Sequence, residues 1–331
     1  MGAQIMIIKN FDDQHEVSGL NLKSHLRAGT IVTLDIDRAR RFYEDFLGFE
    51  CVRYAKDRLL IRDQYAKYAM DSGSNDFFVI DVRKVEKILH PQRLLHHWGV
   101  DVSSVSEVDR IHIEAKANKE RYGLSKVYPV SEVHGSHSFY LTDKDNNWWE
   151  IEFRLDDMEN EDFFARGNIN TESWNTEFHR APKKNVSASV VNSVVGIGHL
   201  THGTCEQLNL KKGREFLQRV LGLRCVHHVE PAQMIAGRGG FGVFAIELPK
   251  VNPQSEENRW IITFENSEDI YRIHVEAKKA KANSEIEYVG AVIQENGWIS
   301  TTIQDGDGNW WEISDRAESY YREMFARGDV S

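Results

Sequence analysis

The chain has 331 residues, of which 41% are hydrophobic, enough for one large domain or for two average domains with separate cores. Its formal net charge of −10 argues against a nucleic-acid partner, which would require a basic surface. The sequence has three scattered cysteines, too few for a disulfide framework, and no apolar run as long as a membrane span, so we expect a cytoplasmic protein with no membrane partner.

The chain opens with an expected N-terminal extension, residues 1–24, whose first stretch, MGAQIMIIKN, is too short and too weakly flanked for a signal peptide. Residues 29–36 are rich in β-branched side chains and predict a strand. The next segment predicts a helix over residues 37–48, with Asp37 as its cap and Gly48 at its end. The apolar face of this helix is formed by Ala39, Phe42, Tyr43 and Phe46.

Three short runs, residues 51–55, 58–63 and 76–82, predict the strands that complete a first βαβββ unit. The same order then restarts. A strand is predicted at residues 96–102, a helix at 105–123, and a terminal hairpin around the turn sequence DKDNN.

The second half of the chain repeats the first. The sequence RIHIEAK begins at Arg110 and RIHVEAK begins at Arg272, and the turns DKDNNWWE and DGDGNWWE end at Glu150 and Glu312 with the same spacing from these motifs. We therefore expect a first domain at residues 25–167, a linker at 168–190 and a second domain at 191–331, each with two βαβββ units.

These motifs resemble the vicinal oxygen chelate superfamily, which includes glyoxalases, bleomycin-resistance proteins and extradiol dioxygenases. The resemblance lies in FY…LGF after a strand and a helix and in D-x-D-[GN]-N-x-x-E in a final hairpin, and it extends from about residue 28 to residue 312. It implies an α+β fold of four βαβββ units in two tandem domains, with curved sheets around a metal pocket. In this family the ligands come from the first strand of each unit and from the hairpin glutamate.

Transferred to this sequence, the resemblance gives six candidate positions. They are Ala28, His97, His199 and Arg259 on the first strands, with Glu150 and Glu312 in the hairpins. If units pair within each half, neither site is complete, because Ala28 has no ligand atom in its side chain and the guanidinium of Arg259 is not a metal ligand. If units two and three pair across the halves, they collect His97, His199 and Glu150, a 2-His-1-carboxylate set, and the other pair is left without a site. His202 is a rival of His199, and His25 of Ala28.

Further candidates follow from the same resemblance. Glu247, near the end of the last strand of unit three, is placed like a fourth ligand of the glyoxalase-like members. Tyr140 precedes Glu150 as in the extradiol pattern, and His134 or His137 would serve as the acid/base.

The leading expectation is an extradiol-type dioxygenase that acts on a catechol-like aromatic small molecule with one divalent metal, Fe(II) before Mn, Ni, Co or Zn. The first alternative is a glyoxalase-like lyase or isomerase that works through an enediolate and uses Glu247 as a ligand. The second alternative is a metal-free protein that binds and sequesters a small molecule. Either a monomer or a homodimer is compatible with four internal units.

Overall fold

A computed structural model describes residues 23–169, 191–228, 232–237, 240–283, 285–295 and 297–330. Most of the expected N-terminal extension and most of the expected linker lie outside these residues. Within them, every helix is too short or too polar to cross a lipid bilayer.

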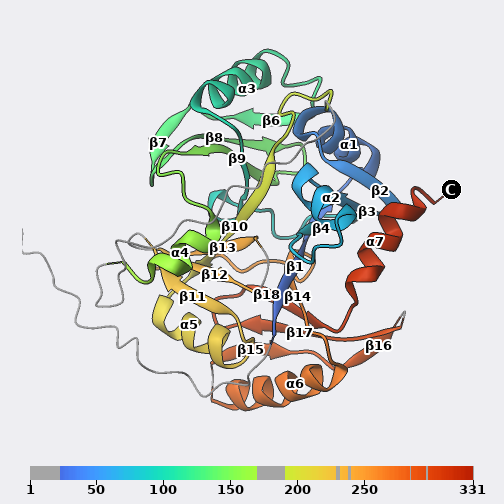
Figure 1. Cartoon of the computed structure of the whole chain (residues 1–331). Coiled ribbons are helices and arrows are strands. Elements are labelled where there is room, and N and C mark those ends of the chain that lie inside the picture. The colour runs from blue at the N-terminus through green and yellow to red at the C-terminus, as the bar shows by residue number, and fades with distance from the viewer. Residues whose placement is uncertain are drawn as a thin grey trace, which may run out of the picture.

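Two mixed sheets, here called sheet A and sheet B, form the framework of the molecule (Figure 1). The strands of sheet A are β1 (His25–Thr33), β2 (Glu50–Ala55), β3 (Arg58–Arg62), β4 (Val79–Lys84), β14 (Arg259–Thr263), β15 (Ile286–Val289), β16 (Ile293–Glu295), β17 (Trp298–Asp305) and β18 (Trp310–Ser314). The strands of sheet B are β5 (Trp98–Asp101), β6 (Leu124–Val127), β7 (Ser131–Val133), β8 (Ser136–Asp143), β9 (Trp148–Arg154), β10 (His199–Gln207), β11 (Arg224–His227), β12 (Ala232–Ala236) and β13 (Gly242–Glu247).

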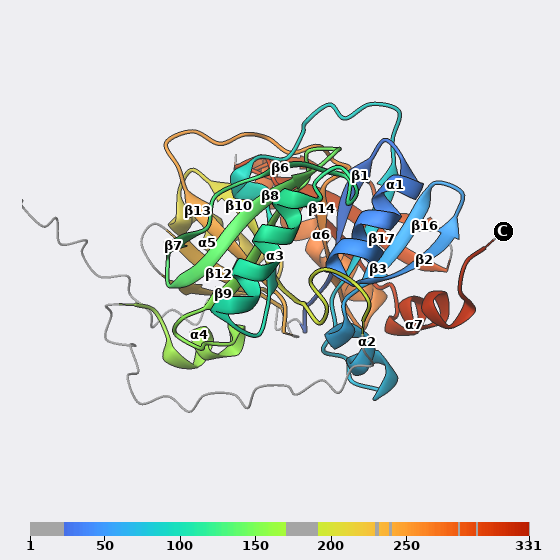
Figure 2. The ribbon, with the colours of Figure 1, turned by 90° about the horizontal axis from the view of Figure 1, so that it is seen from above.

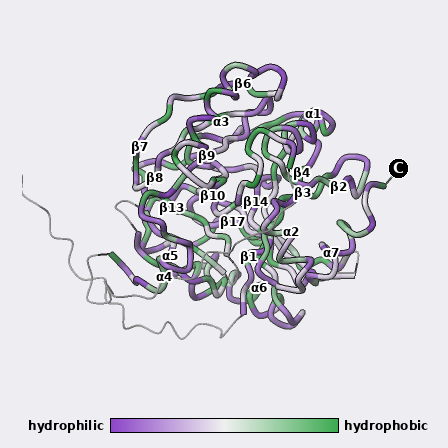
Figure 3. Tube along the Cα trace, turned by 45° about the horizontal axis from the view of Figure 1, so that its top comes forward, coloured by the Kyte–Doolittle hydropathy of each residue, from purple (hydrophilic) through white to green (hydrophobic). Residues whose placement is uncertain are grey.

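The helices are distributed over both sheets. They are α1 (Ile36–Arg41), the π-helix η1 (Phe42–Leu47), α2 (Gln64–Asp71), the short 3₁₀ turn η2 (Leu94–His96), α3 (Val105–Ala117), α4 (Asn160–Arg166), α5 (Leu210–Arg219), α6 (Ser267–Ala282) and α7 (Glu318–Arg327). Polar and apolar residues are interspersed along the chain, because each strand and helix turns one face inward (Figure 3).

Each sheet draws its strands from both halves of the sequence. Sheet A has the order β15-β17-β18-β14-β1-β4-β3-β2, and sheet B has the order β11-β12-β13-β10-β5-β9-β8-β6. The seam of sheet A is the antiparallel pair β1–β14, visible in Figure 1 as a blue strand beside an orange one, and the seam of sheet B is the pair β5–β10. Units one and four therefore share a sheet, as do units two and three, so residues 25–167 and 191–331 each contribute to both sheets.

The first helical segment follows the predicted apolar face but begins earlier than predicted. Asp35, not Asp37, is the cap, because its carboxylate accepts hydrogen bonds from the backbone N–H groups of Asp37 and Arg38 at 3.1 and 3.0 Å. Gly48 ends the segment with φ of 75°, a conformation that favours glycine. Helix α2 is a further difference, because no element was predicted between the strands at residues 58–63 and 76–82.

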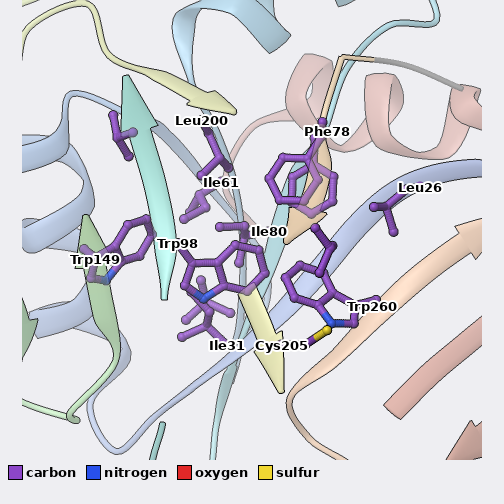
Figure 4. Packing of buried hydrophobic residues seen from close by; sticks show 14 of the residues in the cluster. Leu26, Ile31, Ile61, Phe78, Ile80, Trp98, Trp149, Leu200, Cys205 and Trp260 are labelled. Atoms are coloured by element: carbon purple, nitrogen blue, oxygen red, sulfur yellow. The ribbon is translucent and has the colours of Figure 1, made fainter. Parts of the chain in front are cut away.

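Three tryptophans pack where the two sheets approach each other (Figure 4). Trp98 and Trp260 lie with their ring centroids 4.9 Å apart, and Trp149 packs against Trp98 at 6.5 Å. Gly29 and Gly203 make room for them, because a Cβ atom at either position would lie 2.3 Å from the ring of Trp98 or of Trp260. The recurring tryptophans are thus part of the core.

The repeated polar turns fasten each hairpin to a unit of the other sheet. In sheet B, the carboxylate of Asp145 accepts hydrogen bonds from the Thr33 hydroxyl at 2.6 Å and from Arg38 at 2.6 Å, both in unit one. In sheet A, Asp307 accepts a hydrogen bond from the backbone of Leu208 in unit three at 2.9 Å. The similarity of the two turns therefore reflects assembly of the two sheets.

The segments that follow the two hairpins close the outer edges of the sheets. After α7, Asp329 accepts a hydrogen bond from the backbone of Arg53 on the edge strand β2, at 2.8 Å. After α4, Asn168 accepts the corresponding bond from His227 on the edge strand β11, at 2.6 Å. Figures 1 and 2 show the two helices on opposite sides of the molecule. This pairing makes Arg53 and His227 equivalent positions.

Candidate metal centre

Three buried side chains converge on the inner face of sheet B. The Nε2 atom of His97 lies 3.0 Å from Oε2 of Glu150, and the Nε2 atom of His202 lies 3.6 Å from the same oxygen. The potential ligand atoms of these three residues all lie within 4.8 Å of one another. His97 comes from unit two just before β5, Glu150 comes from β9, and His202 comes from β10 across the seam, so the cluster exists only because the two halves pair.

The orientation of His97 is fixed from behind. Its Nδ1 atom lies 2.6 Å from the carbonyl oxygen of Leu94, which can only accept, so Nδ1 carries the proton. The backbone N–H of His97 also donates to the hydroxyl of Thr204 at 2.9 Å. Nε2 is therefore free to offer its lone pair toward Glu150, which is the arrangement usual for a metal-binding histidine.

His202 has its own group of supporting charges. Its Nδ1 atom lies 3.3 Å from Glu152, and Glu152 in turn lies 3.2 Å from Nε of Arg154. Arg154 also lies 3.3 Å from Asp101. Asp101, whose pKa burial raises well above its ordinary value, and Glu152 thus share the guanidinium of Arg154. Among the described residues Glu150 forms ion pairs only with the two histidines, so His97, Glu150 and His202 are the set that fits a cation better than the group around Arg154.

Electrostatics agrees with this assignment. Burial alone would raise the pKa of Glu150, but His202 and His97, when they are also protonated at Nε2 in the metal-free protein, hold that pKa well below its ordinary value through hydrogen bonds and charge. Glu150 is 6% exposed, and a buried carboxylate of this kind is costly without a cationic partner. A divalent metal ion between the three residues would supply that partner.

A cavity of about 330 Å³ opens beside the cluster. Its apolar lining comes from Leu94, Leu95, Val133, Phe163, Ala232, Phe244 and Ile246, and its polar lining includes His134, Ser136, Tyr140, Glu152, Arg154, Asp156, Thr204 and His228. A small molecule with an apolar body and a few polar groups suits such a space.

Glu247 does not reach this cavity. Side chains alternate along β13, so Phe244 and Ile246 face the cavity and Glu247 faces away from it. Glu247 is exposed, and its carboxylate accepts a hydrogen bond from the backbone of Leu210 at 2.8 Å, at the start of α5. The expectation that Glu247 is a fourth ligand is therefore wrong, because Glu247 makes a structural contact with α5. The residue of β13 that faces the cluster is Phe244.

His199 is also displaced from its expected role. It begins β10, and its ring stacks on Tyr65 with the centroids 4.0 Å apart. The register of β10 against β5 shifts between Leu200 and His202, and this irregularity places His202 at the cluster. The ligand position on this strand is thus three residues later than expected, at the residue that the sequence left as the rival.

The three residues expected to act on protons are separated by the fold. Tyr140 lies beside Glu150 on the neighbouring strand, and its ring centroid is 5.1 Å from that of His97. Burial, together with the carboxylate of Glu150, raises the pKa of Tyr140 well above its ordinary value, so its hydroxyl remains a donor. His134 lines the cavity. His137 does not, because it points toward Asp109 and Glu132, at 3.0 and 3.2 Å.

The equivalent place in sheet A is filled by ion pairs. Glu312 occupies the position of Glu150, but Nε of Arg259 lies 2.9 Å from one of its oxygens and a nitrogen of Arg316 lies 2.9 Å from the other. Ala28 stands where His202 stands in sheet B, since Gly29 and Gly203 hold matching positions against the tryptophans. These two guanidinium groups, with that of Arg83 at 4.0 Å, provide the positive charge, and no histidine faces Glu312 among the described residues.

Two acidic residues that are present in sheet B and absent from sheet A explain why Glu150 faces histidines and Glu312 faces arginines. Arg154 and Arg316 are equivalent, each four residues after its hairpin glutamate. In sheet B, Arg154 is drawn to Asp101 and Glu152, whereas the corresponding pair in sheet A is Thr263 and Ser314. Arg316 therefore turns to Glu312, while Glu150 remains available to the histidines.

Several cavity residues were not among the sequence-derived candidates, and Arg154 and His228 are two basic residues among them. His228 directly follows β11, and the match between CVRY at residues 51–54 and CVHH at residues 225–228 could have indicated that it is equivalent to Tyr54, which points toward Asp81 in sheet A. Arg154 could have been found from its equivalence with Arg316.

Comparison with known proteins agrees with the geometry. The family model described as Glyoxalase/Bleomycin resistance protein/Dioxygenase superfamily matches residues 24–151. Residues 24–151 thus match this superfamily, also called the vicinal oxygen chelate superfamily. No protein of curated function matches the sequence.

Solved structures show the same fold along almost the whole chain. A glyoxalase I mutant from Zea mays has a TM-score of 0.59 at 12% identity, with 92% of this chain and 94% of that chain covered. A candidate dioxygenase from Bacillus subtilis has a TM-score of 0.54 at 12% identity, with 94% and 92% covered. At identities this low the structural similarity establishes the fold alone, and the chemistry of the chain must be argued from its own residues.

Proposed function

We propose that this protein is an extradiol-type dioxygenase of the vicinal oxygen chelate superfamily that opens the ring of a catechol-like small molecule. The observation that carries the proposal is the ligand set: His97, His202 and Glu150 offer three protein ligands, and Phe244 closes the side where a fourth carboxylate would be needed. Three ligands of this kind leave positions free for a bidentate substrate and O₂, and Fe(II) is the metal most typical of such a set. When bound, the metal would supply the Lewis acidity that lowers the pKa of a substrate hydroxyl.

The side chains of the cavity have complementary tasks in this proposal. Tyr140, protonated and adjacent to Glu150, would donate a hydrogen bond to an oxygen bound near the cluster. His134, at the exposed border of the cavity, would exchange a proton with the substrate and with solvent. The rings of Phe163 and Phe244 would pack against an aromatic substrate and exclude water.

The glyoxalase-like alternative is less well supported by the site. It would require a fourth carboxylate that holds the metal and moves a proton, and Glu247 lies outside the cavity. Glu152 does line the cavity, but it accepts a hydrogen bond from Ser136 at 2.5 Å and is paired with Arg154.

The test is oxygen uptake by Fe(II)-reconstituted protein with a panel of catechols, together with the visible absorbance of the ring-opened product. We expect stoichiometric O₂ consumption that His97→Ala abolishes. Turnover of a hemithioacetal without O₂, and none of the catechols, would contradict the proposal and favour the lyase or isomerase.

A further inference from the structure

His228 lies on the cavity wall opposite the metal centre. It directly follows β11 in unit three, and its ring centroid lies 4.5 Å from that of Phe163 and 5.4 Å from that of Phe244. On its other side, Phe244 packs against His202 at 5.2 Å. The ring of Phe244 therefore separates His228 from His202, a candidate metal ligand. One aromatic substrate lying over Phe244 could reach both histidines.

The protonation of His228 is set by Arg166. A guanidinium nitrogen of Arg166 lies 3.1 Å from Nδ1 of His228, and because a guanidinium only donates, Nδ1 must accept. The imidazole is then neutral, with its proton on Nε2. Burial and the nearby charge of Arg166 lower the pKa of His228 to about 3. The further charged or titratable groups that act on His228 are Arg154, His227 and His134.

Sheet A shows what this position does when the protein itself supplies the acceptor. Tyr54 is the equivalent of His228, and its hydroxyl donates to the carboxylate of Asp81 at 2.7 Å. Asp81 pairs with Thr30 on the adjacent strand, and Phe244 pairs with Thr204 in the same register. Phe244 therefore stands where Asp81 stands, and it cannot accept a hydrogen bond. In sheet B the donor, Nε2–H of His228, therefore faces the cavity, whereas its equivalent in sheet A faces a carboxylate.

We propose that Nε2–H of His228 recognises a carboxylate on the substrate, across Phe244 from the two vicinal hydroxyls. The substrate class is thus a catechol whose ring carries a carboxylate substituent, and the positive charge of Arg166 behind the imidazole favours the anion over a neutral acceptor. This inference rests on the proposed function, because the vicinal hydroxyls are the groups that would reach the metal centre.

Binding to the Zn(II)-loaded protein, which cannot turn over, tests the inference by calorimetry with two probes, catechol and 3,4-dihydroxyphenylacetate. Wild type is expected to bind the carboxylate-bearing probe more tightly. His228→Phe keeps the aromatic packing and removes the donor, so it should weaken that probe about ten- to hundredfold and leave catechol almost unchanged. His228→Gln places an amide donor near Nε2 and should recover part of the preference. Tyr54→Phe, the matched change in sheet A, should alter neither affinity.

The tautomer gives a readout that does not depend on substrate or metal. Nitrogen-15 NMR of the metal-free protein should show a neutral His228 with the proton on Nε2 from pH 5 to pH 8, and Arg166→Gln should allow it to titrate in that range. A proton on Nδ1 in wild type would overturn the inference. Equal affinity of wild type for both probes would overturn the role of His228 alone, whereas failure of both probes to bind would contradict the proposed function itself.

Discussion

The residues of the metal centre are selected by what holds them from behind. His97 is fixed by the carbonyl of Leu94, and His202 is fixed by Glu152, so both imidazoles turn Nε2 toward Glu150. Such supporting contacts commonly contribute ten- to hundredfold to metal affinity. They also distinguish His202 from His199, whose ring is occupied by Tyr65.

A pair of alanine variants tests this distinction. His202→Ala removes one of three ligands and should weaken metal binding by at least about a hundredfold, whereas His199→Ala should leave it within about twofold of wild type. Competition with a chromogenic chelator measures both affinities. The reverse order of effects would return the ligand role to His199.

His228 predicts a specific dependence of stability on pH. Its folded pKa, about 3, lies below the value of 6.5 expected when it is unfolded, so the unfolded chain binds the extra proton first. Its contribution to stability is therefore fully present above about pH 6.5 and is lost as the pH falls toward 3. Urea unfolding of metal-free wild type and His228→Phe at several pH values should give a shallower acid slope for the variant, and parallel slopes would contradict the assignment.

The sequence indicated some of these residues and missed others for identifiable reasons. His97 and Glu150 could be placed because each occupies a repeated position beside a tryptophan of the core. The choice between His199 and His202 depends on an irregularity in the pairing of β10, which no local sequence pattern announces. Glu247 was assigned without regard to the alternation of β13, and that rule would have directed attention to Phe244.

At the scale of elements, the polar turns are cross-links between the sheets. Asp145 joins the hairpin of unit two to the end of β1 through Thr33, the backbone of Leu34 and Arg38. The matching turn in sheet A makes fewer hydrogen bonds. Among the described residues, Asp307 accepts one hydrogen bond from unit three, from the backbone of Leu208.

This inequality predicts unequal costs of the same substitution. Asp145→Ala leaves buried donors without a partner and should reduce the free energy of unfolding by about 2–4 kcal/mol. Asp307→Ala is the matched control and should cost about 1 kcal/mol. Chemical denaturation of both variants provides the comparison, and equal losses would show that the turn of sheet B is not a stronger cross-link.

The helices that follow the two hairpins have different roles in the two sheets. In sheet A, Tyr321 and Phe325 of α7 are buried against the inner face, next to Ala28. In sheet B, the shorter α4 contributes Phe163 to the wall of an open cavity. The sequence repeat FARG[ND] indicated two related segments. Whether the helix packs against its sheet, as α7 does, or borders a cavity, as α4 does, depends on the residues that precede the repeat.

At the scale of the whole molecule, the two halves are interdependent. The seams β1–β14 and β5–β10 each join one strand from the first half to one from the second, so neither sheet is complete within one half. The repeat and the fold could be read from the sequence, because four similar units carry matching turns and helices. The pairing of the units could only be argued from where the histidines fall, since either arrangement satisfies the same local patterns.

Separate expression of the halves tests this interdependence. Residues 1–180 or 181–331 alone would expose a seam strand in each sheet and should remain unfolded or aggregate. Co-expressed, the two fragments should recover the helical and strand content and the metal affinity of the intact chain. A single half that unfolds cooperatively and binds metal by itself would contradict the cross-paired arrangement.

The most direct test of the account is the metal stoichiometry of anaerobically purified protein, measured by elemental analysis for wild type, Glu150→Gln and Glu312→Gln. The two variants change equivalent residues in the two sheets. We predict about one metal ion per chain in wild type, a loss in Glu150→Gln, and retention in Glu312→Gln, because Glu312 is held by Arg259 and Arg316. Two metal ions per chain, or a metal lost with Glu312 and kept without Glu150, would contradict a single centre in sheet B.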